Sequence, residues 1–277
     1  MSSYLFCPAN VSKYLINGLN SKAYAIIPDL EDSVPEKSKS GALQNIINII
    51  NNNNNSNNKY IYPRIHNSSN YEWNNTQVAE LSKLNIHGLM IPFTNDFNYF
   101  SKLIQYIKSI NDTLEIIPLI ESIYGMDNMQ KLIKQNDLKF ISFGKYDFSL
   151  DLNIDPEEQN NLINHIKQKF VLNALINKCY PIDTPELNLN NSKLFKESCL
   201  NSKSMGFKAK LAVHPDQLEI INDVFNKVIY DEKDIIKIIK KYESLSKKGI
   251  GSFIFNNNII DLPVYLNLKK VLEDKYE

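Results

Sequence analysis

The chain has 277 residues, of which 43% are hydrophobic and 22% are charged, so it can form one large domain or two small ones. Its 31 basic and 31 acidic residues balance, which argues against a nucleic-acid-binding protein, because phosphate binding needs excess positive charge. No apolar run approaches the ~20 residues that span a bilayer, and residues 1–7 lack the features of a signal peptide. We therefore expect a cytoplasmic protein without nucleic-acid or membrane partners.

The three cysteines, Cys7, Cys179 and Cys199, are odd in number and show no Cys-x-x-Cys spacing. This pattern fits neither a disulfide framework nor a structural zinc site.

The basic residues show a strong bias towards lysine, and Arg64 is the one arginine in the chain. A guanidinium binds a carboxylate through two parallel hydrogen bonds, which an ammonium group cannot do. Arg64 therefore marks a candidate carboxylate-binding site, with chance in a lysine-rich composition as the alternative.

Short apolar segments alternate with longer amphipathic ones along most of the chain. The predicted strands are residues 4–7, 25–28, 60–65, 88–91, 114–120, 140–143, 180–182 and 210–213. Helical spacing of apolar residues is found between them, for example in residues 37–50, 97–110 and 160–177. The polar tract 51–58 predicts a surface loop.

Eight strand-helix units in roughly 215 residues predict an α/β fold, a (β/α)₈ TIM barrel. A doubly wound sheet is the alternative, but the chain has only 8 glycines and no Gly-x-Gly-x-x-Gly after the first strand. We expect the barrel in residues 1–230 and a helical extension in residues 231–277.

Apolar residues have helical spacing in residues 217–227, which precede the extension, and in residues 232–247, which lie within it. Gly249 and Gly251 break the pattern, and residues 253–260 predict a small hairpin before the closing segment 261–277. This extension is more than a barrel needs, and it could form a lid over the mouth of the active site or reach a neighbouring subunit.

Polar residues follow the predicted strands at the end where barrel enzymes have their active sites. In chain order they are Asp29, Glu31, Asp32, Arg64, Glu121, Asp147, Asp183 and His214. A ring of acids with one arginine fits a hard divalent cation and an anionic substrate, and the His and Cys ligands of zinc are missing from it.

Each of these residues also has a structural interpretation. The three acids after the second strand could cap the next helix, and Asp147 and His214 could be ordinary loop residues. Asp183, close to two prolines, could cap a turn. Glu121 ends so apolar a strand that its carboxylate needs a partner.

Short motifs occur in order at the spacing of barrel strands. They are Tyr4-Leu-Phe-Cys-Pro-Ala9, Ile27-Pro-Asp-Leu-Glu-Asp-Ser33, Pro63-Arg64, Ile117-Pro-Leu-Ile-Glu-Ser122, Phe143-Gly-Lys-Tyr-Asp147, Ile182-Asp-Thr184, Gly206-Phe-Lys-Ala-Lys210, Val213-His-Pro215 and Ile260-Asp-Leu-Pro263. Together they resemble the citrate lyase β-subunit-like branch of the HpcH/HpaI aldolase family, over nearly the whole chain.

The resemblance implies a Mg²⁺ site with Glu121 and Asp147 as ligands and Mn²⁺ as an alternative metal. Glu31 and Asp32 match acids that hold the water ligands of that metal. Arg64 matches the arginine that faces the substrate carboxylate and carbonyl oxygen.

The resemblance also implies a proton-transfer acid, Asp261, on a lid that comes from the adjacent subunit of a homotrimer. The substrate pocket would include Phe6, Pro8, Asp29, Pro92 and Asp183. Many members of the family cleave or form C–C bonds of acyl-CoA thioesters, so the expected small-molecule partner is an α-keto or β-hydroxy acid, with an acyl-CoA as a further candidate.

Departures from the family pattern fall on the side of the pocket that would bind CoA. Ser2 stands where the family has a basic residue, Ala9 replaces a glycine, and Phe93 occupies a position often held by lysine. Tyr146 also replaces a frequent glutamate. The metal and carboxylate end is thus expected to be intact, and the thioester end altered.

These residues favour a Mg²⁺-dependent C–C lyase or aldolase that works through an enolate stabilised by the metal. One alternative is a non-catalytic or regulatory barrel, which the altered basic positions favour. Another is a thioester hydrolase on the same scaffold.

Overall fold

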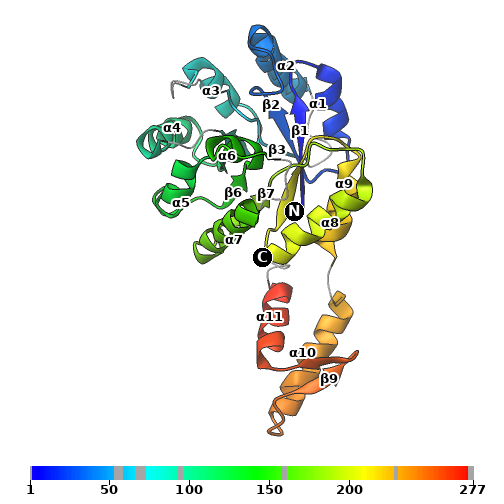
Figure 1. Ribbon diagram of the computed structural model, residues 1–277. Helices are drawn as coiled ribbons and strands as arrows, with labels where there is room; N and C mark the ends of the chain where they lie inside the picture. Colours follow the sequence, from blue (N-terminus) through cyan, green and yellow to red (C-terminus); the bar gives the residue numbers. More distant parts are fainter. Residues whose placement is uncertain are drawn as a thin grey trace. The chain divides into compact units, whose positions relative to one another are not determined.

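The computed structural model describes residues 2–52, 59–66, 73–92, 96–156, 161–227 and 230–273. The chain forms two compact units, Met1–Asn226 and Lys227–Glu277. The first contains an eight-stranded parallel sheet, and the second contains two helices and a hairpin (Figure 1).

The first unit has the predicted barrel architecture. Its strands are β1 (Ser3–Pro8), β2 (Ala25–Asp29), β3 (Tyr60–Ile61), β4 (Gly88–Ile91), β5 (Glu115–Ile120), β6 (Phe140–Phe143), β7 (Tyr180–Asp183) and β8 (Ala209–Ala212). They are ordered β3-β2-β1-β8-β7-β6-β5-β4, and every named pair is parallel.

Helices connect the strands and lie outside them (Figure 1). They are α1 (Ser12–Leu19), α2 (Lys39–Asn52) after a short 3₁₀ turn (Glu36–Ser38), α3 (Asn75–Ser82), α4 (Phe97–Ile110), α5 (Ile123–Asn136), α6 (Lys145–Asp151), α7 (Asn161–Ile176), α8 (Ser192–Met205) and α9 (Gln217–Asn226).

Backbone contacts of Arg64 close the barrel between β2 and β4. Arg64 N donates to Pro28 O at 2.9 Å, and Met90 N donates to Pro63 O at 2.9 Å. Arg64 forms isolated parallel bridges to both Asp29 and Met90. Because proline has no N–H to donate, regular pairing is interrupted here, and β3 is shorter than the predicted strand 60–65.

Side chains alternate between the inside and the outside of the barrel. Along β1, Tyr4 belongs to the inner core and Leu5 to the outer core beneath the helices. The inner core is rich in aromatic rings: Tyr62 packs near Tyr4 and Phe140, with centroids 6.1 and 6.4 Å apart. These rings fill the barrel interior, which branched aliphatic side chains usually fill in TIM barrels.

The second unit has a small core of its own. It consists of α10 (Glu232–Ser246), the hairpin strands β9 (Phe253–Phe255) and β10 (Asn258–Ile260), and α11 (Leu262–Glu273). Asn256 and Asn257 form the hairpin turn with φ of 46° and 63°, a left-handed conformation that asparagine tolerates. The predicted hairpin is confirmed. The core is formed by Ile235, Ile238, Tyr242, Ile260 and Leu268.

The polar tract expected as a loop from residue 51 is described only in part. Residues 51 and 52 continue α2, so the predicted start of the loop was wrong, and residues 53–58 lie outside the described residues. None of the described helices is both long enough and apolar enough to cross a bilayer.

Gly88 allows β4 to lie against β5. A Cβ atom at residue 88 would lie 2.1 Å from Glu115 O, a backbone atom that cannot move aside. We expect Gly88→Ala to destabilise the protein by about 1–3 kcal/mol, the usual cost of overpacking. Urea unfolding measures this change. Gly41→Ala is the control, because nothing lies within 4 Å of its added Cβ, and it should cost nothing.

Candidate active site at the carboxyl ends of the strands

Arg64 is held by a two-pronged ion pair with Asp29. Its Nε lies 2.6 Å from Asp29 Oδ1 and its Nη2 lies 2.7 Å from Oδ2. Asp29 also accepts hydrogen bonds from Ser33 Oγ and from the backbone N–H groups of Glu31 and Ser33. With its side chain fully buried and both oxygens occupied, Asp29 positions the guanidinium.

Two further acids contact the remaining Nη1 of Arg64. Glu31 Oε2 lies at 2.8 Å and Asp32 Oδ2 at 3.1 Å. Glu31 is buried, whereas 62% of the Asp32 side chain is exposed. The Phe6 ring lies under the guanidinium, with its centroid 4.8 Å from Cζ. The structure thus brings together four residues predicted for the site around Arg64.

Asp29 and Glu31 differ in how strongly they hold a proton. Burial opposes ionisation of Asp29, but Arg64 and the hydrogen bonds outweigh it, and the pKa of Asp29 lies below its ordinary value. Burial, followed by the adjacent Asp32 carboxyl, raises the pKa of Glu31 to about 9 despite the opposing charge of Arg64. The pKa of Arg64 is raised, because its acidic partners outweigh its burial.

Glu121 and Asp147 come from the ends of neighbouring strands. Glu121 follows β5 and is 4% exposed, and Asp147 lies in the first turn of α6, which follows β6. Gly144 N donates to Ile120 O at 2.9 Å and joins the two strand ends. Burial and the charge of Asp32 raise the pKa of Asp147, while Arg64 lowers it. Asp147 therefore lies within electrostatic reach of the arginine.

The residues fit a magnesium ion by the chemistry of their donors. In the part of the chain that the structure describes, no group of three or more His, Cys, Asp and Glu side chains could hold a metal. Mg²⁺ commonly takes only one or two carboxylates and keeps water or substrate oxygens elsewhere. Gly144 leaves room for one of these carboxylates, since a Cβ there would lie 3.0 Å from Glu121 Oε2.

The predicted pocket prolines end two strands of the barrel. Pro8 is half-buried and pairs with Asp29 in the register of β1 and β2, and Pro92 is buried directly after β4. Phe93 lies outside the described residues. Ser2 has a structural contact: its Oγ and that of Ser3 both donate to Asn222 Oδ1 at 2.8 Å.

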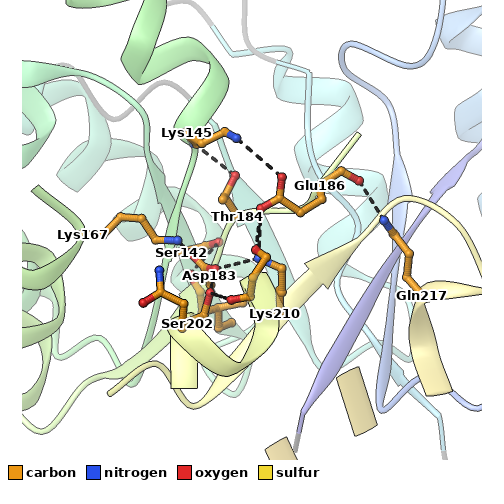
Figure 2. A network of polar contacts seen from close by, with 12 residues as sticks. Ser142, Lys145, Lys167, Asp183, Thr184, Glu186, Ser202, Lys210 and Gln217 are labelled. Atoms are coloured by element: carbon orange, nitrogen blue, oxygen red, sulfur yellow. Dashed lines mark hydrogen bonds and ion pairs between the residues drawn. The ribbon is translucent and has the colours of Figure 1, made fainter. Parts of the chain in front are cut away.

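Asp183 lies in a closed cluster of ions, shown in Figure 2. Lys210 Nζ donates to Asp183 Oδ2 at 2.7 Å, and Lys167 Nζ lies 2.8 Å from Oδ1. Ser202 Oγ also donates to Oδ2. Burial opposes ionisation, but the two ammonium groups hold the pKa of Asp183 well below its usual range. Its role in the substrate pocket stays a prediction.

The sequence patterns do not predict this cluster as a unit. Lys210 appeared only as part of a motif, and Lys167 lies in a helix where lysine is usually solvated. The available signal was Asp183 itself, because an acid that ends an apolar strand needs a partner. The partner's position depends on how α7 packs, which spacing along the chain does not reveal.

The comparisons with known proteins agree with the motifs. A family model for HpcH/HpaI aldolase/citrate lyase matches residues 2–215. The chain belongs to this family. It is 19% identical to the Citrate lyase subunit beta-like protein of Deinococcus radiodurans, over 98% of this chain and 96% of the relative. It is 24% identical to the L-malyl-CoA/beta-methylmalyl-CoA lyase of Rhodobacter capsulatus, over 93% of this chain and 89% of that enzyme.

Solved structures share the fold. A citrate lyase from Burkholderia xenovorans has a TM-score of 0.83 at 13% identity, over 99% of this chain and 91% of that one. Mycobacterium tuberculosis CitE, in complex with magnesium, acetoacetate and coenzyme A, has a TM-score of 0.76 at 17% identity, over 100% of this chain and 98% of that one. Both the predicted barrel and the predicted family are confirmed.

Asp261 belongs to the second unit of this family member, where it lies between β10 and the first residue of α11, Leu262. Its Oδ1 accepts a hydrogen bond from Val264 N at 3.1 Å, and its carbonyl accepts one from Tyr265 N at 2.9 Å. These two contacts hold Asp261 against the first turn of α11, directly after the hairpin. Its part in proton transfer stays a prediction.

The cluster around Asp183 predicts a specific response to mutation and pH. Asp183→Asn leaves two buried lysines without their carboxylate, and we expect a loss of about 3–5 kcal/mol in the free energy of unfolding. Since the folded pKa is depressed, the stability supplied by Asp183 is present above pH of about 4 and declines as the pH falls further.

Urea unfolding of both proteins at about pH 7 and about pH 3 tests this linkage. The difference between wild type and Asp183→Asn should shrink in acid. An unchanged difference would mean that the charge of Asp183 does not stabilise the fold. Asp216→Asn is the control, because the Asp216 side chain is 90% exposed.

Proposed function

We propose that the protein is a Mg²⁺-dependent C–C lyase or aldolase that acts on an α-keto acid or a β-hydroxy acid. The observation that carries this proposal is the buried Arg64, clamped by Asp29 at the carboxyl ends of the strands, the end of the barrel where Glu121 and Asp147 also follow their strands. Relatives named as lyases of malyl-CoA and citramalyl-CoA support it. So does a citrate lyase β subunit solved with oxaloacetate and magnesium.

Arg64 binds the anionic end of the substrate. Asp29 occupies the Nε–H and one Nη2–H of the guanidinium, which leaves the second Nη2–H and the Nη1 edge shared with Glu31 and Asp32. A substrate carboxylate or carbonyl oxygen accepts from this edge. As C–C cleavage moves charge onto that oxygen, the fixed guanidinium stabilises it without reorganisation.

Glu121 and Asp147 would hold the Mg²⁺ ion, which supplies Lewis-acid polarisation of a carbonyl oxygen when bound. Glu31 and Asp32 would hold water ligands of that metal. Phe6 covers the flat face of the guanidinium and keeps it out of solvent.

Asp261 would move the proton that converts an enolate into the product, or take it in the reverse direction. We place it on a lid supplied by a neighbouring subunit of a homotrimer. The acyl partner is the part of the reaction in which this protein would differ from its family. At position 2, where the family has a basic residue on the CoA side of the pocket, Ser2 is buried against Asn222. A non-CoA or unusual acyl partner follows from that change.

Calorimetric titration with pyruvate, glyoxylate and oxaloacetate tests the keto-acid site. We expect binding that requires Mg²⁺ and disappears in Arg64→Ala. Arg64→Lys should bind the keto acid little better than Arg64→Ala, since an ammonium group cannot replace both hydrogen bonds of the guanidinium. Acetyl-CoA in the same titration examines the thioester end. Absence of keto-acid binding with or without Mg²⁺ would contradict the proposal and favour a non-catalytic barrel.

Exchange of pyruvate methyl protons for deuterium, followed by ¹H NMR in D₂O with Mg²⁺, tests Asp261. We expect Asp261→Asn to abolish exchange while keto-acid binding stays unchanged, because a proton carrier need not bind the substrate. If exchange persists at the wild-type rate, Asp261 does not move the proton. Exchange into acetyl-CoA instead of pyruvate would identify the thioester as the enolate partner.

Mixed oligomers show whether Asp261 acts in its own subunit. Arg64→Ala and Asp261→Asn proteins, each inactive alone, should recover exchange when they are unfolded together and refolded, since a mixed oligomer contains sites with both residues intact. No recovery despite mixed assembly would place Asp261 over the barrel of its own chain.

A further inference from the structure

The two candidate metal ligands belong to different segments of the chain. Asp147 lies in the first turn of α6, and Glu121 lies in the turn between β5 and α5. Mg²⁺ demands near-ideal octahedral geometry, so carboxylates from two segments can share one ion only if the segments are held at a fixed separation. The contacts between these two segments therefore decide how well the site is formed.

At the strand ends, the two segments are joined through Gly144. Its N–H donates to Ile120 O at 2.9 Å. The Glu121 side chain packs directly on this glycine, because a Cβ atom at residue 144 would lie 2.8 Å from Glu121 Cβ and 3.0 Å from Oε2. These contacts hold the segment up to Glu121, and the turn that follows it is held from elsewhere.

Asp151, the last residue of α6, makes the second connection. Its Oδ2 accepts a hydrogen bond from the backbone N–H of Ile123 at 2.7 Å. Ile123 is the first residue of α5 and lies two residues after Glu121. Its N–H is one of the donors for which a helix offers no acceptor of its own, so Asp151 supplies that acceptor from another helix.

The cap of α5 serves a different donor. Ser122 is the N-cap residue, and its Oγ accepts from Gly125 N at 3.0 Å, the third N–H of the helix. Asp151 and Ser122 thus divide the N-terminal donors of α5 between them. Removal of the Asp151 side chain would release Ile123 N while the N-cap stays in place.

The position of Asp151 is explained by α5 and not by its own helix. An acid at the C-terminus of a helix is unfavourable, because the partial charge there is negative. The same carboxylate lies at the N-terminus of α5, where negative charge is favourable. Residue 151 is also exposed, so packing of the core does not require an acid there.

We propose that Asp151 is a positioning residue for the metal site, which sets the orientation of Glu121 relative to Asp147 by holding the N-terminus of α5 against α6. Asp147 and Asp151 are four residues apart on α6, about one helical turn. The helix is therefore a rigid spacer between a metal ligand and the contact with α5. This role rests on the proposed Mg²⁺ site and adds to it a residue that touches neither metal nor substrate.

Binding of Mn²⁺, followed by EPR of the free ion, tests this role without turnover. We expect the wild-type protein to bind Mn²⁺ and Glu121→Gln to lose that binding, which identifies the site. Asp151→Ala should weaken the affinity on the order of tenfold, as residues that orient a metal ligand do. Asp151→Asn should restore most of it, because the amide Oδ1 can accept the same hydrogen bond from Ile123 N.

Asp127→Ala is the matched control. Asp127 is an exposed acid in the second turn of α5, so its replacement removes one negative charge from the same helix. We expect unchanged Mn²⁺ affinity. Together with Asp151→Asn, this variant separates the effect of the hydrogen bond from the loss of a charge near the metal.

The EPR spectrum of the bound ion guards against a folding defect in Asp151→Ala. A displaced ligand changes the zero-field splitting of bound Mn²⁺, whereas a loss of stability changes only the amount of folded protein. We therefore expect an altered spectrum for Asp151→Ala and a spectrum like that of the wild type for Asp151→Asn.

The outcomes separate this role from the proposed lyase activity. Wild-type affinity in a folded Asp151→Ala protein would overturn the positioning role and leave the lyase standing, as would equal weakening in Asp151→Ala and Asp151→Asn. The expected Mn²⁺ results in a protein that binds no keto acid would support the role of Asp151 and contradict the lyase. Absence of Mn²⁺ binding in the wild type would overturn both.

Discussion

The ion pair between Asp29 and Arg64 joins the closure of the barrel to the candidate active site. The backbone of Arg64 bridges β2 and β4, and its side chain meets Asp29 through two hydrogen bonds. A buried guanidinium without an acid would be costly, and a buried carboxylate without a cation equally so. Each therefore requires the other, and the pair holds the guanidinium of Arg64 in one orientation.

The barrel divides its interior by polarity. Aromatic rings such as Tyr4, Tyr62 and Phe140 fill the inner core. Acids and Arg64 gather at the carboxyl ends of the strands, where α6 also brings Asp147 towards the group. A second set of ions, centred on Asp183, connects β7 and β8 to α7. The two sets differ in their contacts: in the first, one guanidinium is shared by three acids, and in the second, one carboxylate is shared by two lysines.

The strands were predictable from the sequence because parallel strands buried on both faces form short apolar runs. β4 and β6 agree with prediction at both ends, whereas β3 is shorter, since Pro63 interrupts the ladder at the seam of the barrel. Of the candidate site, Arg64 and its acidic neighbours could be anticipated, because strand ends meet at one rim. Lys167 could not, because its contact with Asp183 depends on how α7 packs against the barrel.

The sequence by itself determined the alternation of strands and helices, the family, and which residue types stand at the strand ends. These are local properties, set by apolar periodicity and by short motifs. Only the tertiary structure decided which acids Arg64 contacts, that Asp29 is saturated by those contacts, and that Asp183 is enclosed by two lysines. Such pairings join residues far apart in the chain, and their energies depend on burial and distance, which only the folded chain defines.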